Sequence, residues 1–322
     1  MRIPVFVCVL IAERVDNQVL DLKGNIRVFC RPRPASNKGK SALTLGSDTE
    51  LACEVAGKSH AFTYDCVFSD EAEQAGVFAE AQPLIVSVLD GYHACILAYG
   101  QTGSGKTHTM QGYSASDAGV NTRAISEIFA IAKEREGTHS YTIKVTLIEI
   151  YNETLRDLLE PRDASGKDKA LDIKLASSTS DLPGYTSGTC VPGLYVAEVH
   201  TMEHVLSALS KGEQNRSVAG TDMNQRSSRS HMVLTVFVEG RHLSSEATTF
   251  GKLHLIDLAG SERLARSGAE GQQLKEAQNI NRSQTSLSPH THAVYLVRVC
   301  LCATLGRGAA RGEKGHLVSD SI

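Results

Sequence analysis

The stretch from Gly100 to Thr107 constrains this chain most strongly. It reads Gly-Gln-Thr-Gly-Ser-Gly-Lys-Thr and matches the pattern G-x-x-x-x-G-K-[ST]. An apolar run over residues 94–99, typical of a buried strand, precedes it, and no helix breaker follows before Gly112. A strand that leads into a glycine loop and then into a helix is the context in which this pattern binds phosphate. The motif therefore predicts a phosphate-binding loop, with a chance junction between a loop and a helix as the alternative.

The residue types in this loop suit a nucleoside triphosphate. Glycines let backbone N–H groups turn inward around phosphate oxygens, and the start of a helix adds partial positive charge. Lys106 is expected to reach the β- and γ-phosphates, and the Thr107 hydroxyl is expected to bind Mg²⁺. The predicted nucleotide-binding residues of the loop are Gly100, Gln101, Thr102, Gly103, Ser104, Gly105, Lys106 and Thr107.

Composition limits the class of protein. A chain of 322 residues can form one large α/β domain or two small ones. With 41% apolar residues, 21% charged residues and a net charge of −3, neither a disordered chain nor a polyanion-coating protein is indicated. The apolar run at residues 3–12 is too short to span a bilayer and lacks a small-residue cleavage site, so a buried or partner-facing segment is favoured over a signal sequence.

The eight cysteines form no C-x-x-C pair, which indicates reduced thiols in a cytosolic protein. Cys30 and Cys95 lie in strand-like apolar runs and are predicted to be core residues. The apolar positions Ala12, Val15 and Val19 continue to Leu22 with gaps of three and four. This short seam fits an ordinary amphipathic helix or the end of a dimerising stalk, and both readings stay open.

Hydrophobic patterning predicts alternating strands and helices, and hence an α/β sheet that is largely parallel near the phosphate loop. Small hairpin strands are expected within residues 35–60, and residues 160–192 read as a loop-rich excursion. The expected strands are 25–31, 94–99, 141–151, 232–238 and 252–258. The expected helices are 71–89 with a kink at Pro83, one capped by Thr122 that buries Ile125, Ile128, Phe129 and Ala132, a short one at 153–159, and one at 202–212.

Two further motifs point to a nucleotide switch. The segment from Asn224 to His231 is polar throughout and precedes a strand, and the segment from Asp257 to Glu262 follows one. An aspartate at the end of a strand is where P-loop NTPases keep the carboxylate on the Mg²⁺ side. Gly260 can offer its backbone N–H to a γ-phosphate because no Cβ is in the way.

Together these motifs resemble the kinesin motor domain over about residues 24–283. The phosphate loop followed by His-Thr-Met, the N-x-x-S-S-R-S-H segment and the D-L-A-G-S-E segment occur in the order of that family. Arg31-Pro32-Arg33-Pro34 resembles its adenine-side R-x-R-P motif, and Glu149-Ile150-Tyr151-Asn152-Glu153 resembles its strand-end signature. The resemblance implies a P-loop NTPase kinesin fold, with a mostly parallel-to-mixed central sheet flanked by helices.

The resemblance also implies residue roles. Arg31, Arg33 and Pro34 would flank the adenine, and His108 would stack on it. Ser228 would reach Mg²⁺ and the γ-phosphate together with Thr107 and Asp257, while Ser227 would position the attacking water. Gly260 would sense the γ-phosphate. Arg229 and Glu262 would form the ion pair that closes the switches, with Glu262 relaying the proton of the water.

The junction from Leu22 to Val28 resembles kinesin-14, whose catalytic domain follows the stalk and which moves toward microtubule minus ends. The implied cofactors are ATP and Mg²⁺. The implied partners are microtubules and a second copy of the chain, joined through an upstream coiled coil, with no nucleic acid and no membrane. The implied location is the microtubule cytoskeleton of the cytoplasm. In this division residues 1–23 are the remnant of the neck helix and residues 24–283 are an incomplete motor domain.

After Ser283 the chain departs from the family pattern, and Pro289 is expected to end the switch II helix early. The family's basic loop, next helix, central strand and last helix are not recognisable in residues 284–322. One reading places the apolar run 293–302 as a strand between the strands at 25–31 and 94–99. The other reading makes 284–322 a divergent tail, with residues 306–315 suited to disorder.

Three functions follow from these observations. The leading one is an ATP-driven microtubule motor. The second is a nucleotide- or tubulin-binding fragment that does not cycle, because its microtubule-facing half is not recognisable. The third is a P-loop GTPase, and the absence of an N-K-x-D base-reading motif counts against it.

Overall fold

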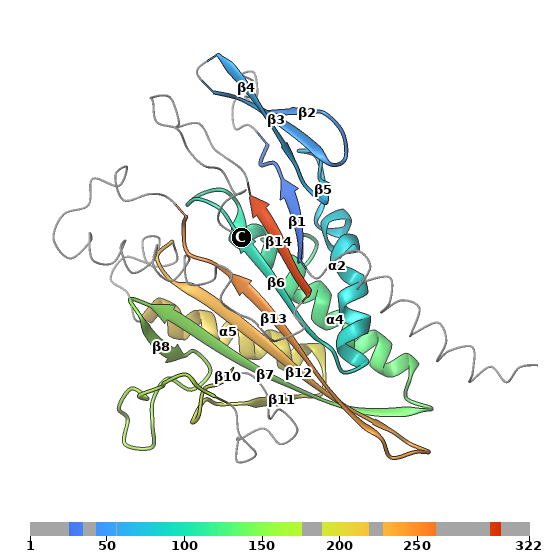
Figure 1. The fold of residues 1–322 in the computed structure, drawn as a ribbon. Helices are drawn as coiled ribbons and strands as arrows, with labels where there is room; N and C mark the ends of the chain where they lie inside the picture. Colours follow the sequence, from blue (N-terminus) through green and yellow to red (C-terminus); the bar gives the residue numbers. More distant parts are fainter. Residues whose placement is uncertain are drawn as a thin grey trace, which may run out of the picture.

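A mixed β-sheet organises the structure, a computed structural model that describes residues 26–34, 43–55, 57–175, 189–218, 228–261 and 297–303. Within these residues the sheet has nine strands in the order β11-β7-β12-β13-β6-β14-β1-β5, with β8 paired to β7 (Figure 1). Their bounds are β1 (Ile26–Arg31), β5 (Cys66–Val67), β6 (His93–Tyr99), β7 (His139–Tyr151), β8 (Thr154–Asp157), β11 (Ala197–Val199), β12 (His231–His242), β13 (Thr248–Asp257) and β14 (Val297–Ala303).

The direction of the strands changes across this sheet. β6 is parallel to both of its neighbours, β13 and β14, and β1 is parallel to β14 and β5. β12 is antiparallel to both β7 and β13, with which it forms long continuous ladders. The expectation of a sheet that is largely parallel near the phosphate loop is therefore confirmed, and the sheet as a whole is mixed.

The C-terminal strand β14 lies inside the sheet rather than at its edge. It pairs in parallel with β1 on one side and with β6 on the other, so that Val299 is in register with Arg27 and with Ile96. Figure 1 shows it as the red arrow between the blue β1 and the teal β6. This is the place that one reading of the sequence assigned to the run 293–302. Residues 293–296 lie outside the described residues.

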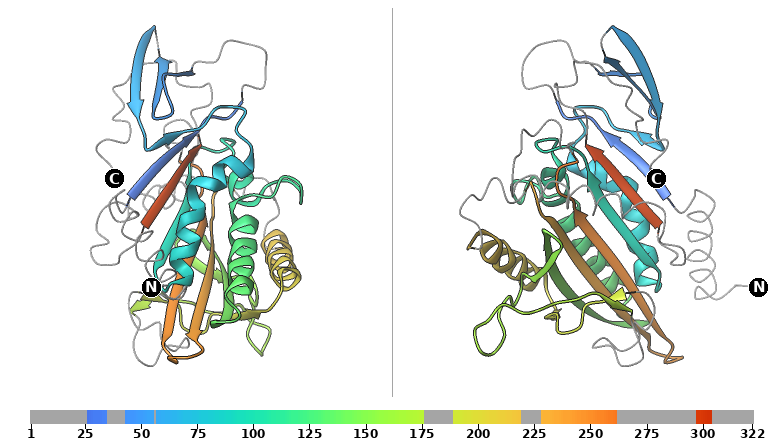
Figure 2. Two further views of the ribbon diagram at one scale, coloured as in Figure 1. Left: turned by 90° about the vertical axis from the view of Figure 1, so that its right-hand side faces the viewer. Right: turned by 60° about the vertical axis from the view of Figure 1, so that its left-hand side comes forward.

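Four helices are described: α2 (Gln74–Leu89), α3 (Lys106–Gln111), α4 (Val120–Glu134) and α5 (Met202–Val218). Both views of Figure 2 show α2, α4 and α5 on the same side of the sheet. α2 contributes fully buried side chains such as Leu84 and Ile85, which join Ile96 and Leu255 of the sheet in one hydrophobic cluster. Side chains alternate along a strand, so the residues next to Ile96 on β6 and next to Leu255 on β13 face the other side of the sheet.

That second face of the sheet carries polar residues in its middle. The Nδ1 atom of His254 on β13 lies 2.9 Å from the hydroxyl of Thr235 on β12. Burial, together with the charges of Lys252 and His93, lowers the pKa of His254 to about 3. His254 is therefore neutral at physiological pH and acts as a hydrogen-bonding group within the sheet.

Two small sheets extend from the central one. β2 (Leu43–Leu45), β3 (Glu50–Val55) and β4 (Lys58–Thr63) form an antiparallel sheet beyond the end of β1, at the top of Figure 1. β9 (Lys174–Leu175) and β10 (Thr189–Cys190) pair as a two-stranded antiparallel sheet. The hairpin strands expected within residues 35–60 are thus confirmed, and so is the burial of Cys30 and Cys95.

The expected helix at residues 153–159 is wrong. Residues 154–157 form β8, which folds back antiparallel on β7 with Tyr151 opposite Thr154. Asn152 and Glu153 make the turn between them with φ values of 50° and 61°. A two-residue hairpin turn of type I′ has positive φ at both central positions, and asparagine is one of the residues that tolerates it. The pairing with β7 overrides the local helical pattern.

The expected cap of α4 is also wrong. α4 begins at Val120 with Gly119 as its N-cap, so Thr122 lies inside the helix. A Cβ at position 119 would overlap the backbone of Met110 and Gln111, and this close approach requires glycine there. Of the expected buried face, Ile125 and Ile128 are fully buried, while Phe129 and Ala132 are partly buried against the same cluster.

Some expectations fall on residues outside the described ones. These are the neck helix at 1–23, the switch II helix before Ser283, and residues 284–296 and 304–322 on either side of β14. Within the part that the structure describes, no helix is long and apolar enough to cross a membrane.

Candidate nucleotide site

A pocket of about 670 Å³ opens where β1, β6 and β13 end. It is lined by Arg31 to Pro34 after β1, by Thr102 to Thr109 after β6, and by Ser228 and Leu258. All three strands run in the same direction and present their carboxyl ends to this pocket. Ligands in open α/β sheets bind outside the carboxyl ends of the strands. The sheet therefore brings together motifs that lie more than 200 residues apart in the sequence.

The phosphate loop has the backbone conformation that its glycines suggest. Gly103 and Gly105 have φ values of 76° and 105°, in the left-handed region that favours glycine. The ammonium group of Lys106 is buried and donates hydrogen bonds to the carbonyls of Gly100 and Gln101, at 2.8 and 3.0 Å. The lysine is thus folded back over the loop, with its charge held inside the ring of backbone that would surround a phosphate.

Thr107 and Asp257 meet behind the loop. The Thr107 hydroxyl donates a 2.7 Å hydrogen bond to Oδ2 of Asp257, whose residue is 5% exposed. Oδ1 of Asp257 is buried and has no hydrogen-bond partner among the described residues. Burial raises the pKa of Asp257, and the Thr107 hydrogen bond and the Lys106 charge oppose that rise.

This pair fits the Mg²⁺ that the motifs imply. Mg²⁺ prefers oxygen ligands and in nucleotide sites uses one or two carboxylates together with phosphates and waters, and P-loop NTPases add Ser or Thr hydroxyls. A hydroxyl beside a buried carboxylate oxygen that lacks a partner offers that chemistry. The Ser104 hydroxyl is also buried without a partner among the described residues, so the loop has polar capacity left for a ligand.

The two switch segments meet through their backbones. The Gly260 N–H donates a 2.8 Å hydrogen bond to the carbonyl of Ser228, and the Ser261 N–H donates one of 3.1 Å to Gly100. The Ala259 N–H donates to Nδ1 of His231, whose pKa is lowered to about 4 by burial and by the charge of Lys106. The Gly260 N–H must leave Ser228 before it can bind a γ-phosphate as the sequence predicts.

Not every predicted switch residue is described. Ser228 lies on the pocket wall as expected, and Arg229 follows it. Ser227 and Glu262 lie outside the described residues, so the Arg229–Glu262 ion pair and the water-positioning role of Ser227 stay predictions.

The predicted adenine-side residues gather at one rim of the pocket, where Arg31, Arg33, Pro34 and His108 all line it. Arg33 donates a hydrogen bond to the carbonyl of Gly103 and thereby ties this rim to the phosphate loop. The guanidinium of Arg31 already donates hydrogen bonds to other groups of the protein.

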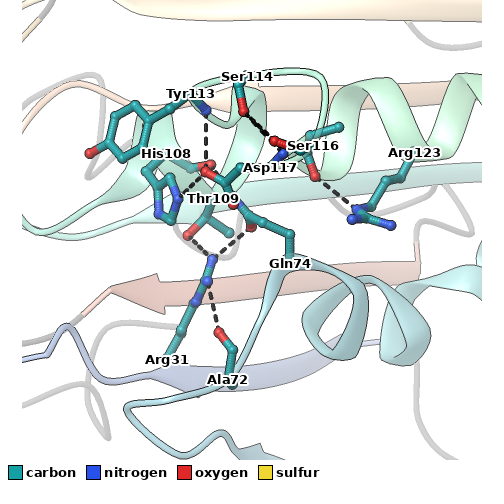
Figure 3. A network of polar contacts seen from close by, with 11 residues as sticks. Arg31, Ala72, Gln74, His108, Thr109, Tyr113, Ser114, Ser116, Asp117 and Arg123 are labelled. Atoms are coloured by element: carbon teal, nitrogen blue, oxygen red, sulfur yellow. Dashed lines mark hydrogen bonds and ion pairs between the residues drawn. The ribbon is translucent and has the colours of Figure 1, made fainter.

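Sequence reasoning missed the partners of Arg31 and His108, which Figure 3 shows together. Arg31 donates to Oε1 of Gln74 at 2.9 Å, to the Thr109 hydroxyl at 3.0 Å and to the carbonyl of Ala72 at 3.0 Å. Gln74 in turn donates to the carbonyl of His108 at 2.7 Å. Arg31 therefore holds the start of α2 against α3. These partners come from separate segments and follow no sequence pattern that could have revealed them.

A buried ion pair supports the switch segment from behind. Glu149 near the end of β7 is fully buried, and its carboxylate lies 3.3 Å from Nε of Arg216 near the end of α5. Arg216 also donates a 2.9 Å hydrogen bond to the Ser230 hydroxyl. The sequence marked Glu149 only as part of a strand-end signature. The structure shows that Glu149 pairs with Arg216, which in turn holds Ser230 just before β12.

Comparison with known proteins agrees with this architecture. A model of the kinesin motor domain matches residues 35–294. The kinesin-like protein KIN-14H of Arabidopsis thaliana is 45% identical over 286 residues, which is 85% of this chain and 26% of that protein. The chain thus spans about a quarter of the length of this curated relative.

Solved structures agree as well. The C-terminal motor and motor homology domain of Kar3Vik1, fused to a synthetic heterodimeric coiled coil, is similar with a TM-score of 0.78 and 29% identity, over 91% of this chain and 83% of that one. The motor domain of the Kar3-like kinesin from Ashbya gossypii has a TM-score of 0.69 and 31% identity, over 87% and 92%. The phosphate loop, the paired switches and these matches together show that the chain belongs to the kinesin motor domain family, and that it is of the kinesin-14 type.

Proposed function

We propose that this chain is the motor domain of an ATP-driven microtubule motor that hydrolyses Mg·ATP. The observation that carries the proposal is the contact between Thr107 and Asp257, with the second oxygen of Asp257 buried and lacking a partner among the described residues. It joins the phosphate loop to the second switch segment at the point where a metal-bound triphosphate must be held. The membership of the chain in the kinesin family supports the same activity.

The residues of the phosphate loop and of the Mg²⁺ side would each have a distinct role in this reaction. When bound, Mg²⁺ supplies positive charge that neutralises the β- and γ-phosphates. Thr107, Ser228 and Asp257 would hold the ion. Lys106 would exchange its two backbone carbonyl partners for phosphate oxygens, which compensate its buried charge better than neutral carbonyls do.

The switch residues would carry the chemical step. Ser227 would position the attacking water, and Glu262 would take up its proton. Arg229 would hold Glu262 in place, and the pair would be shielded from solvent. Breaking a buried ion pair costs about 3–5 kcal/mol, whereas a surface pair contributes about 0–1 kcal/mol. Arg229→Glu should therefore abolish turnover while nucleotide binding persists, and retained ATPase activity in this variant would refute the role.

The hydrogen bond from Gly260 to Ser228 suggests how the site senses its nucleotide. The two switch segments are joined through this contact, so a γ-phosphate that takes the Gly260 N–H changes their relative position. We propose that this change is passed along the chain after Ser261 to the microtubule-binding surface. We also propose that the motor domain includes β14, because β1 and β6 are both paired to it.

The test is the steady-state ATPase activity of the purified chain with and without microtubules. A motor should show turnover that microtubules stimulate and that Lys106→Ala abolishes. Lys58→Ala, which changes an exposed lysine of β4, serves as the matched control and should leave turnover unchanged. Binding of Mg·ATP without turnover would instead support the non-cycling fragment, and no binding at all would refute the proposal.

Direction and assembly are further parts of this proposal. We propose movement toward the microtubule minus end, a homodimer formed through an upstream coiled coil, and a location on the cytoplasmic microtubule cytoskeleton. The support is the similarity to relatives named KIN-14 and the kinesin-14-like junction from Leu22 to Val28. In a gliding assay on polarity-marked microtubules, a minus-end motor drives the filaments with their plus ends leading. Gliding with the minus ends leading would refute the direction.

A further inference from the structure

The loop between α3 and α4 is folded back onto the adenine rim of the pocket. Gly112 and Ala118 pair across its neck in an antiparallel bridge. The Gly119 N–H donates a 3.0 Å hydrogen bond to the carbonyl of Gln111, and the Gly112 N–H donates one of 2.8 Å to the carbonyl of His108. The loop therefore returns Asp117 to the side of His108, although nine positions separate the two residues in the sequence.

Asp117 holds the imidazole ring of His108. Its Oδ2 atom lies 2.8 Å from Nε2 of His108, and it also accepts a hydrogen bond from the Tyr113 N–H at 3.4 Å. The side chains of His108 and Asp117 are 26% and 37% exposed, so the pair sits at the mouth of the pocket. An ionised carboxylate only accepts hydrogen bonds, so Nε2 of His108 must carry the proton. The contact thus sets both the orientation and the tautomer of the ring.

Other contacts hold the same ring. Tyr113 stacks on it with a centroid separation of 4.4 Å and an interplanar angle of 22°. The backbone carbonyl of His108 is bound by Gln74, which Arg31 holds in turn. The ring is therefore fixed from its backbone, from its edge and from one face, as Figure 3 shows.

We propose that Asp117 is a positioning residue for base recognition, which holds the His108 ring in the orientation that stacks on the adenine. The inference rests on the proposed function, because it assigns the adenine to this rim. No described contact joins Asp117 to Lys106 of the phosphate loop, or to Thr107 and Asp257 on the Mg²⁺ side. Its effect should therefore be confined to the base and should spare the triphosphate.

Simple electrostatics makes the opposite prediction. Asp117 is a negative charge at the mouth of a pocket for a polyanion, so its removal alone would strengthen the binding of every polyphosphate slightly. Positioning predicts weaker binding of ATP and unchanged binding of a polyphosphate that has no base. The sign of the change for ATP and the comparison between the two ligands separate the two effects.

The experiment measures the dissociation constants of Mg·ATP and of Mg·tripolyphosphate by calorimetry. Asp117→Ala should weaken Mg·ATP by about five- to tenfold, the net value of one hydrogen bond between partly exposed groups, and should change tripolyphosphate by less than about twofold. Asp117→Asn keeps an acceptor for Nε2 and should recover most of the affinity. In a His108→Ala background, Asp117→Ala should add less than about twofold, because its target is gone.

Glu198→Ala is the matched control, since Glu198 lies on β11, outside the pocket, and pairs with the exposed His200. It should leave both dissociation constants unchanged. Equal weakening of both ligands by Asp117→Ala, no weakening of ATP, or an undiminished effect in the His108→Ala background would each overturn the proposal. A wild-type chain that binds neither ligand would refute the proposed function instead.

A second measurement needs no Asp117 variant and so does not depend on how well one folds. ¹⁵N NMR of the histidine side chains of the nucleotide-free protein should show His108 as the Nε2–H form, assigned by the signals that disappear in His108→Phe. A His108 ring that is protonated at Nδ1 alone would overturn the proposal.

Discussion

Replacing Val299 with proline should destabilise the whole motor fold, because β14 lies between two parallel strands. Val299 is in register with Arg27 of β1 and with Ile96 of β6. Proline has no N–H to donate to the ladder and is confined to edge strands or bulges in natural sheets. In the interior of a helix proline costs about 3 kcal/mol or more, and in the middle of a sheet it likewise removes a ladder hydrogen bond, so a loss of similar size is expected here. That is a large share of the roughly 5–15 kcal/mol by which domains are stable.

The full contribution of β14 is larger. It has six register pairs with β1 and six with β6. With about one hydrogen bond per pair and a net value of about 0.5–1.5 kcal/mol each, the two ladders contribute about 6–18 kcal/mol. This range is comparable with the whole stability of a domain, so a chain that ends before residue 297 should fail to fold cooperatively.

Urea denaturation followed by circular dichroism measures the effect. Val299→Pro should lower the free energy of unfolding by at least about 3 kcal/mol. The matched control is Thr44→Pro on β2, which pairs with β3 alone at the edge of the small sheet and should lose much less. Equal midpoints for the two variants, or an unchanged midpoint for Val299→Pro, would refute the reasoning that β14 is a structural strand of this sheet.

Three further predictions concern the site, the sheet and the core. Thr107→Val keeps the shape of the side chain but removes the hydroxyl, so Mg²⁺ should no longer tighten ATP binding. The affinity for ATP in the presence of Mg²⁺ should fall at least about tenfold. Calorimetry with and without Mg²⁺ measures this loss, and the control Thr122→Val in α4 should not show it. The folded-state pKa of His254 is about 3, below the ordinary value of 6.5. Its contribution is therefore fully present above pH 6.5 and is lost as the pH falls toward 3, by about 2 kcal/mol between pH 7 and pH 5. His254→Asn should flatten the pH dependence of the unfolding free energy by that amount, and an unchanged slope would contradict the assignment. Leu84→Ala opens a cavity at a fully buried position of α2 and should cost about 2–5 kcal/mol in urea denaturation, whereas Leu206→Ala at a position 48% exposed should cost far less.

Local patterns predicted the parts of this fold that depend on neighbours in the sequence. The apolar runs of β6, β7, β12 and β13 are long enough to identify strands, and the glycines of the phosphate loop require the conformations that Gly103 and Gly105 adopt. The same reasoning failed at residues 153–159. There the pairing with β7 stabilises a strand that a local window reads as a helix.

The sequence by itself therefore determined the chemistry of the site: a phosphate loop, a hydroxyl and a carboxylate for Mg²⁺, and two switch segments in the order of the kinesin family. Each of these depends on residue type and short spacing. Only the tertiary structure decided the partners of those residues. It selected one of the two readings of the run 293–302 by placing β14 between β1 and β6. It also joined Glu149 to Arg216 and returned Asp117 to His108. The last two contacts link residues that no local pattern relates, because the folded sheet and its loops bring them together. The phosphate loop could be read from eight residues, but the groups that orient its neighbours could be found only in the folded chain.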